Sequence, residues 1–143
     1  MTTSWEPLDT TTHQDHVIAH VVDATVMGYA ILDETLYVLV DIGFIWKIYL
    51  DGEMVLLPQS VAISELEVSQ ETRRLIQSES DALIKGELDR EFEYMVPATL
   101  ECTITEVNIF AAGDQRRLVV SGAEASLAIE TSLATSEMKV YEF

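Results

Sequence analysis

All three histidines of the chain lie close together, at His13, His16 and His20. Histidine nitrogen is a common zinc ligand, and on a helix these three positions would share one face. The β-branched residues that begin at Val17 favour a strand instead. In a strand, His16 and His20 would lie about 13 Å apart at about 3.3 Å per residue, whereas a zinc ion needs each nitrogen at about 2 Å. A histidine-dependent metal site is therefore the weakest of three functional hypotheses.

The second hypothesis is a small-molecule-binding or enzymatic site inside a β-barrel. Asp41 interrupts an apolar run, and Trp46 and Tyr49 follow it on the same stretch of chain. Aromatic walls with a few polar groups are typical of ligand pockets. Aromatic residues at strand spacing are more often plain core, and an aspartate beside Gly43 is typical of a strand break.

No motif in the sequence favours a particular reaction. Val120-Ser121-Gly122 lacks the first glycine of a nucleophile elbow, and there is no glycine-rich phosphate loop. Cys102 is the single cysteine, which excludes an intrachain disulfide and a cysteine-based zinc ribbon. Because Cys102 alternates with Leu100 and Ile104, it is predicted to be buried. We predict no cofactor and favour a protein that is not an enzyme.

Net charge is the most informative property of the chain. It carries 25 Asp and Glu against 8 Lys and Arg, a formal charge of −17, although 48% of its residues are hydrophobic. That hydrophobic content is typical of a packed domain rather than a disordered tail. The negative charge opposes nucleic-acid binding through phosphates and binding to anionic membranes, and it favours a cationic partner.

Many of the carboxylates gather on and around Ser69–Leu88, the one predicted helix, whose N-cap is Ser69. The leading hypothesis is a small acidic interaction module that binds a basic protein partner through this helix face, with electrostatic steering of association. A solvated face that keeps the domain soluble is the alternative. We also expect a homo-oligomer formed through exposed strand hydrophobics. The residues assigned to the acidic face are Glu71, Glu79, Asp81, Glu87, Asp89 and Glu91.

The start of the chain has neither the basic beginning nor the apolar centre of a signal peptide. No stretch approaches the roughly 20 apolar residues of a membrane-spanning helix. We therefore expect a soluble, cytoplasmic protein.

Turn signals and β-branched runs predict a three-strand meander. Val17–Leu32, Thr35–Leu50 and Glu53–Pro58 are predicted as strands, joined by turns at Asp33-Glu34 and Asp51-Gly52. The first turn sets Gly28 opposite Leu39. Because Thr35–Leu50 is apolar on both faces, it is predicted to be covered on both sides.

A second, longer hairpin is predicted after the helix, between Ala98–Phe110 and Arg116–Thr131. Ile109 faces Leu118 in this register. Near Glu106 the inward-facing positions change parity in both strands together, which predicts a sharp bend.

These elements predict a mainly β, α+β domain with one helix. The expected architecture is an antiparallel curled sheet or partly open barrel built from the meander, the helix and the long bent hairpin. Residues 1–143 form a single domain, with 1–15 as an irregular lead-in and 132–143 as an edge strand or tail.

Overall fold

The computed structural model describes residues 4–32, 35–41, 45–51, 53–56, 66, 68–132, 134–135 and 137–143. Over these residues the chain is mainly β, as predicted, with two helices and antiparallel sheets. Its elements are β1 (Glu6–Leu8), α1 (Thr12–Val21), β2 (Val26–Leu32), β3 (Thr35–Val40), β4 (Ile45–Asp51), β5 (Glu53–Leu56), α2 (Gln70–Lys85), β6 (Val96–Pro97), β7 (Ile104–Ala112), β8 (Gln115–Gly122), β9 (Leu127–Ser132) and β10 (Met138–Glu142).

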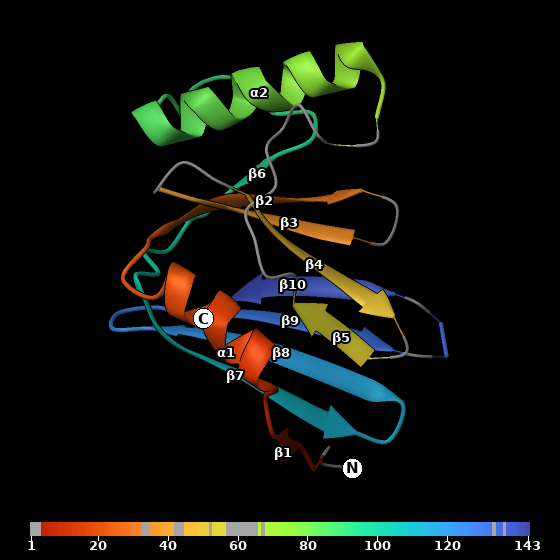
Figure 1. The fold of residues 1–143 in the computed structure, drawn as a ribbon. Coiled ribbons are helices and arrows are strands. Elements are labelled where there is room, and N and C mark those ends of the chain that lie inside the picture. The colour runs from red at the N-terminus through yellow and green to blue at the C-terminus, as the bar shows by residue number, and fades with distance from the viewer. Residues whose placement is uncertain are drawn as a thin grey trace.

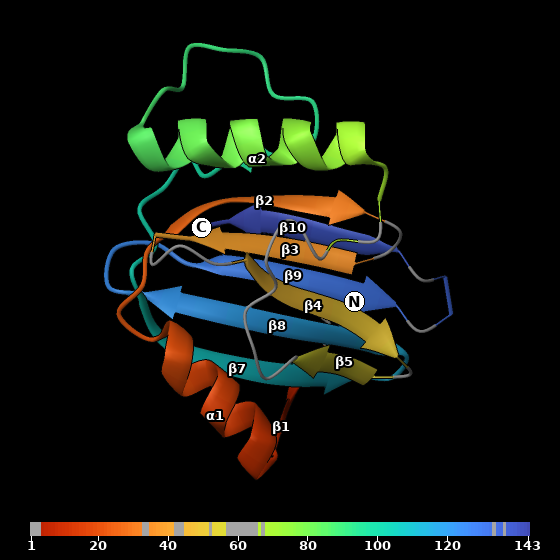
Figure 2. The ribbon, with the colours of Figure 1, turned by 45° about the horizontal axis from the view of Figure 1, so that its top comes forward.

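The strands of the described part of the chain form two five-stranded sheets. The outer sheet has the order β1-β7-β8-β9-β10, and the middle sheet has the order β5-β4-β3-β2-β6. Helix α2 lies over the far side of the middle sheet, so that the layers run helix, middle sheet, outer sheet (Figures 1 and 2). The sheets do not close into a barrel, and of the two expected architectures the curled sheet is the one found.

The larger core lies between the two sheets. Leu36, Val38 and Ile48 of the middle sheet pack against Leu118 and Ile129 of the outer sheet, and all are almost fully buried. Val17 and Val21 of α1 join the same cluster. Burial of aliphatic side chains from both sheets supplies most of the force that holds the layers together.

A smaller core lies between the middle sheet and α2. Leu39 and Ile45 of the middle sheet meet Ile76 and Leu83 of the helix, together with Met95 of the segment that follows it. The middle sheet is therefore apolar on both faces and covered on both. This confirms the prediction made from Thr35–Leu50.

Helix α1 corrects the prediction for the start of the chain. Residues 1–15 were expected to be irregular and Val17 was expected to begin a strand, but β1 spans Glu6–Leu8 and α1 begins at Thr12. The Thr11 side chain accepts a hydrogen bond from the Gln14 amide, and the Gln14 side chain accepts one from the Thr11 amide. This capping box starts a helix, and burial of apolar residues on one face outweighs the strand preference of valine.

The two long predicted strands each turn back as a hairpin. Thr35–Leu50 divides into β3 and β4, and Arg116–Thr131 divides into β8 and β9, with each pair antiparallel. At the first break, the Asp41 Oδ1 accepts a hydrogen bond from the Thr25 amide at 2.9 Å, while the Asp41 amide donates to the Thr25 carbonyl at 3.0 Å. The meander consequently has four strands, β2 to β5, rather than three.

Two predicted registers and the predicted bend are confirmed. Gly28 pairs with Leu39, and Ile109 pairs with Leu118. A bulge shifts the β7 and β8 pairing between Ile104 and Glu106, which is where the change of parity predicted a bend. The last predicted edge strand is β10, at one side of the outer sheet.

Helix α2 matches the predicted helix closely. The Ser69 side chain accepts from the Thr72 amide at its start. At its end Gly86 has φ of +76°, and the amides of Gly86 and Glu87 donate to the carbonyls of Leu83 and Ala82. This is the Schellman pattern, and it favours glycine at the left-handed position.

We expect Gly28→Ala to destabilise the protein by about 1–3 kcal/mol, because a β-carbon there overpacks the contact between the middle sheet and α2. That carbon would lie 2.7 Å from the Val96 carbonyl oxygen and 2.8 Å from Leu83 Cδ1. The free energy of unfolding, measured by urea titration, checks this. An unchanged value would show that α2 can shift without cost.

Candidate interaction surface

Five of the six carboxylates predicted to form the acidic face are exposed. Glu71 and Asp81 lie on α2, and Glu87, Asp89 and Glu91 lie in the segment that follows it. The sixth, Glu79, has 0% of its surface exposed. Glu79 is therefore not part of a surface that a partner could reach, and this assignment was wrong.

Glu79 instead fastens the segment after α2 to the helix. Its Oε1 accepts hydrogen bonds from the amides of Tyr94 and Met95, at 3.0 and 3.1 Å. Its other oxygen, Oε2, is buried and has no hydrogen-bond partner among the described residues. A buried carboxylate satisfies backbone amides that would otherwise be costly to bury, so the role of Glu79 is structural.

Further contacts hold the same segment along the helix. The Arg90 guanidinium donates to Ser78 Oγ at 3.0 Å and lies 5.7 Å from the centre of the Phe92 ring. The Tyr94 hydroxyl lies 3.4 Å from Thr72 Oγ1. The exposed carboxylates between residues 87 and 93 thus lie on a segment that is held against α2 by Arg90 and by Tyr94.

The acidic excess lies on the segment that follows the helix rather than on the helix itself. On α2 itself, exposed Glu71 and Asp81 are balanced by Arg74 and Lys85. The following segment adds four exposed acids against Arg90 alone. We call the acidic-end surface the group formed by Asp81, Glu87, Asp89, Glu91 and Glu93.

Two exposed apolar side chains lie within the acidic-end surface. Ile84 is 44% exposed and Leu88 is 57% exposed. Apolar residues surrounded by charged ones are the usual composition of a binding site, in which the apolar group supplies affinity and the charges supply orientation.

Of the three residues of the predicted ligand pocket, the structure describes the side chain of Asp41 alone. Asp41 is exposed and engaged with Thr25 at the break between β3 and β4. The side chains of Trp46 and Tyr49 lie outside the described residues. Between the sheets, the described residues form a packed core, and two surface hollows that described residues line have volumes of about 240 and 130 Å³. Small-molecule pockets usually exceed about 300 Å³.

His16 and His20 lie on α1 and not on a strand. The separation of about 13 Å that a strand would give therefore does not apply to them. Both are exposed, and the Nδ1 of His20 lies 2.8 Å from the His16 carbonyl oxygen. The His13 side chain is outside the described part of the chain. Within that part, no group of three or more His, Cys, Asp or Glu side chains is placed to hold a metal ion.

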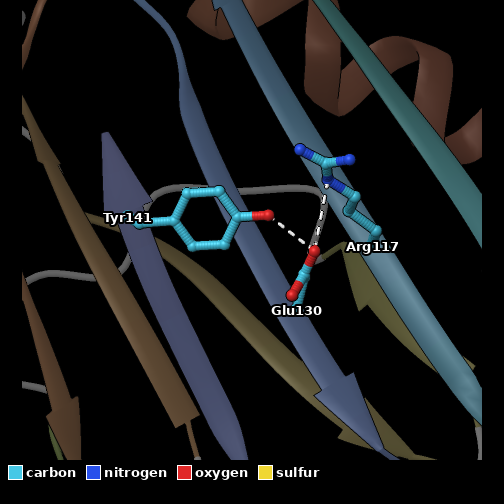
Figure 3. A network of polar contacts seen from close by, with 3 residues as sticks. All are labelled: Arg117, Glu130 and Tyr141. Carbon is cyan, nitrogen blue, oxygen red and sulfur yellow. Dashed lines mark hydrogen bonds and ion pairs between the residues drawn. The ribbon is translucent and has the colours of Figure 1, made fainter. Parts of the chain in front are cut away.

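Sequence reasoning missed a cluster on the outward face of the outer sheet. The Arg117 guanidinium lies 5.8 to 5.9 Å from the ring centres of Trp5, Tyr141 and Phe143. Its Nε lies 3.6 Å from Glu130 Oε1, which accepts a 2.6 Å hydrogen bond from the Tyr141 hydroxyl (Figure 3). These residues are far apart in sequence, so no local pattern could have identified them.

A second missed interaction joins the end of β10 to the segment before β7. The Glu142 carboxylate accepts hydrogen bonds from the amides of Thr99 and Leu100 and from the Thr99 hydroxyl, at 2.7 to 3.1 Å. Burial opposes the charged form, but these hydrogen bonds outweigh it and lower the pKa of Glu142.

The negative charge of Glu142 also affects two neighbours. Burial, and then this charge, raise the pKa of the Cys102 thiol and of the Tyr29 hydroxyl. A thiol with a raised pKa is a poor nucleophile. Cys102 is buried, as predicted.

Comparison with protein-family models, with curated protein sequences and with solved structures found no match. Among the described residues, no helix is long and apolar enough to cross a membrane. Any functional assignment therefore depends on the surfaces described above.

Glu79→Ala should destabilise the protein by about 3 kcal/mol, because it leaves the buried amides of Tyr94 and Met95 without an acceptor. Glu71→Ala, at an exposed position on the same helix, should change the free energy of unfolding by less than about 0.5 kcal/mol. Thermal unfolding followed by circular dichroism compares the two. Equal effects would contradict the structural role of Glu79.

Glu142→Gln should make the free energy of unfolding depend less steeply on pH in the acid range. The pKa of Glu142 is lower in the folded than in the unfolded protein, so its stabilisation is present above the unfolded pKa and lost as the pH falls through the folded pKa. Wild type should therefore exceed the variant in stability by about 1 kcal/mol at pH 7, and the difference should disappear below the ordinary glutamate value of 4.5. Urea titrations at several pH values test this, and a constant difference would contradict it.

Proposed function

We propose that this chain is a small acidic interaction module that binds a basic protein partner through the acidic-end surface. The observation that carries the proposal is the grouping of five exposed carboxylates with exposed Ile84 and Leu88, at the end of α2 and on the segment that runs back beside it. Such a surface fits a partner segment that combines Lys or Arg with apolar side chains.

The anchored backbone supports the proposal. A binding surface held in place before association avoids the entropic cost of ordering on binding. Glu79 fixes residues 94 and 95, and Arg90 is already engaged with Ser78 and Phe92. The Arg90 guanidinium is therefore engaged within the molecule, while the carboxylates of the same segment stay exposed.

The net charge supports it as well. A molecule with a formal charge of −17 attracts cationic partners over distances up to about 10 Å at 0.1 M salt. The electrostatic field of the net charge attracts the partner. The local carboxylates and the two apolar side chains then determine where on the surface it binds.

The triple variant Glu87→Lys, Asp89→Lys, Glu91→Lys should abolish retention of the basic partner. Wild-type protein is immobilised, exposed to a native lysate of its source and eluted with rising salt, and eluted proteins are identified by mass spectrometry. Wild type should retain a stoichiometric basic protein that elutes at moderate salt, because screening weakens exposed charge pairs.

A matched triple variant, Asp9→Lys, Glu124→Lys, Glu137→Lys, gives the same change in net charge at exposed positions elsewhere. It should retain the partner to within about twofold of wild type, because the local carboxylates remain. Equal loss in both variants would reduce the interaction to non-specific charge attraction, and no retention by wild type would overturn the proposal.

A further inference from the structure

The outward face of the outer sheet is a second surface suited to association. Because Ile109, Leu118 and Ile129 point into the core, the residues that alternate with them point outward. The outward side chains of β7 to β10 include Asn108, Phe110, Arg117, Val119, Ala128, Glu130, Lys139 and Tyr141. No helix or further sheet among the described residues covers this face, but the rings of Trp5 and Phe143 lie beside Arg117 on it, and Ala128 is fully buried beneath its neighbours.

Two cross-strand rows define the pattern of this face. In the first row, Phe110 pairs with Arg117, Arg117 with Glu130, and Glu130 with Lys139. In the second row, Asn108 pairs with Val119, Val119 with Ala128, and Ala128 with Tyr141. Each row crosses β7, β8, β9 and β10 in that order.

The central ion pair of the first row has unused bonding capacity. The side chain of Arg117 is 24% exposed and that of Glu130 is 31% exposed, and at 3.6 Å their contact is longer than a hydrogen bond. The Arg117 guanidinium makes no hydrogen bond to a described residue, and its Nε is buried. The rings of Trp5, Tyr141 and Phe143 lie around this guanidinium, and Figure 3 shows Arg117 and the Tyr141 ring on either side of Glu130.

We propose that a second copy of this chain docks on this face about a twofold axis that runs parallel to the strands, between β8 and β9. Such an axis places each row opposite the same row of the second copy, with the order of the strands reversed. Arg117 then meets Glu130 of the other copy, and Phe110 meets Lys139. In the second row Asn108 meets the Tyr141 hydroxyl edge, while Ala128 is fully buried and makes no contact.

Every pair produced by this axis is complementary. Arg117 and Glu130 form two reciprocal charge-assisted pairs, and Lys139 lies against the Phe110 ring as a cation–π contact. Reciprocal contacts of this kind are what an isologous interface requires. Sheets packed face to face with nearly aligned strands are a common arrangement.

Net charge also favours a second copy on this face. The outward charges of β7 to β10 are Glu106, Arg117, Glu130 and Lys139, two of each sign, on a chain whose formal charge is −17. Two such chains repel each other least where their charges balance. The acidic-end surface lies across the molecule, beyond the middle sheet (Figure 2), so a dimer leaves both of its acidic-end surfaces open.

Sedimentation equilibrium of the full chain should show a dimer. Arg117→Glu and Glu130→Arg should each raise the dimer dissociation constant at least tenfold, because each places like charges across the axis. An equimolar mixture of the two variants should recover the dimer, since every pair across the interface is again opposite in sign. The pair within each chain stays broken in this mixture, so recovery cannot come from repair of the monomer.

Lys139→Glu is a milder variant at an exposed strand position, and it should also weaken the dimer while circular dichroism shows an unchanged fold. A monomeric wild type would overturn the proposal, as would a dimer unaffected by these variants or a mixture that stays monomeric. The measurement needs no basic partner, so its failure leaves the proposed function of the acidic-end surface standing, and the reverse is also true.

Discussion

The middle sheet is apolar on both faces, and the rest of the structure depends on covering both of them. Leu36 and Ile48 face the outer sheet, while Leu39 and Ile45 face α2. A strand layer of this kind is stable only between two others, because each uncovered aliphatic side chain would forgo about 1.5–3 kcal/mol of burial. The hairpins, the helix and the close approach at Gly28 all serve this three-layer arrangement.

With the interior taken up by these two cores, the negative charge must lie on the remaining surface, and it is not spread evenly. The segment after α2 is rich in acids, whereas the outward face of the outer sheet is balanced in charge and rich in aromatic residues. Glu79 is the exception, since it is buried and bonded to backbone amides. The buried carboxylate of Glu79 thus holds in place the segment that carries the exposed ones. The uneven distribution of charge distinguishes the acidic-end surface from the outward face of the outer sheet.

The grouping of acidic residues around α2 could be predicted because local composition is enough to show it. The carboxylates around α2 follow one another in the chain, so their grouping is visible in the sequence, and five of them are exposed as expected. Which one turns inward depends on the packing of the segment up to Met95 on the helix. The cluster of Arg117, Glu130 and Tyr141 depends on strand pairing across β8, β9 and β10, which no local pattern encodes.

The sequence by itself determined the α+β class, the start of α2 at its N-cap Ser69, and the pairing of Gly28 with Leu39 and of Ile109 with Leu118. These follow from capping groups, turns and alternating apolar residues, which act over a few residues. Only the tertiary structure decided that Thr12–Val21 is a helix, that two long strands fold back as hairpins, and that Glu79 is buried. Local preferences differ by less than about 1 kcal/mol per residue, and burial of side chains such as Val17 and Val21 against distant strands outweighs them.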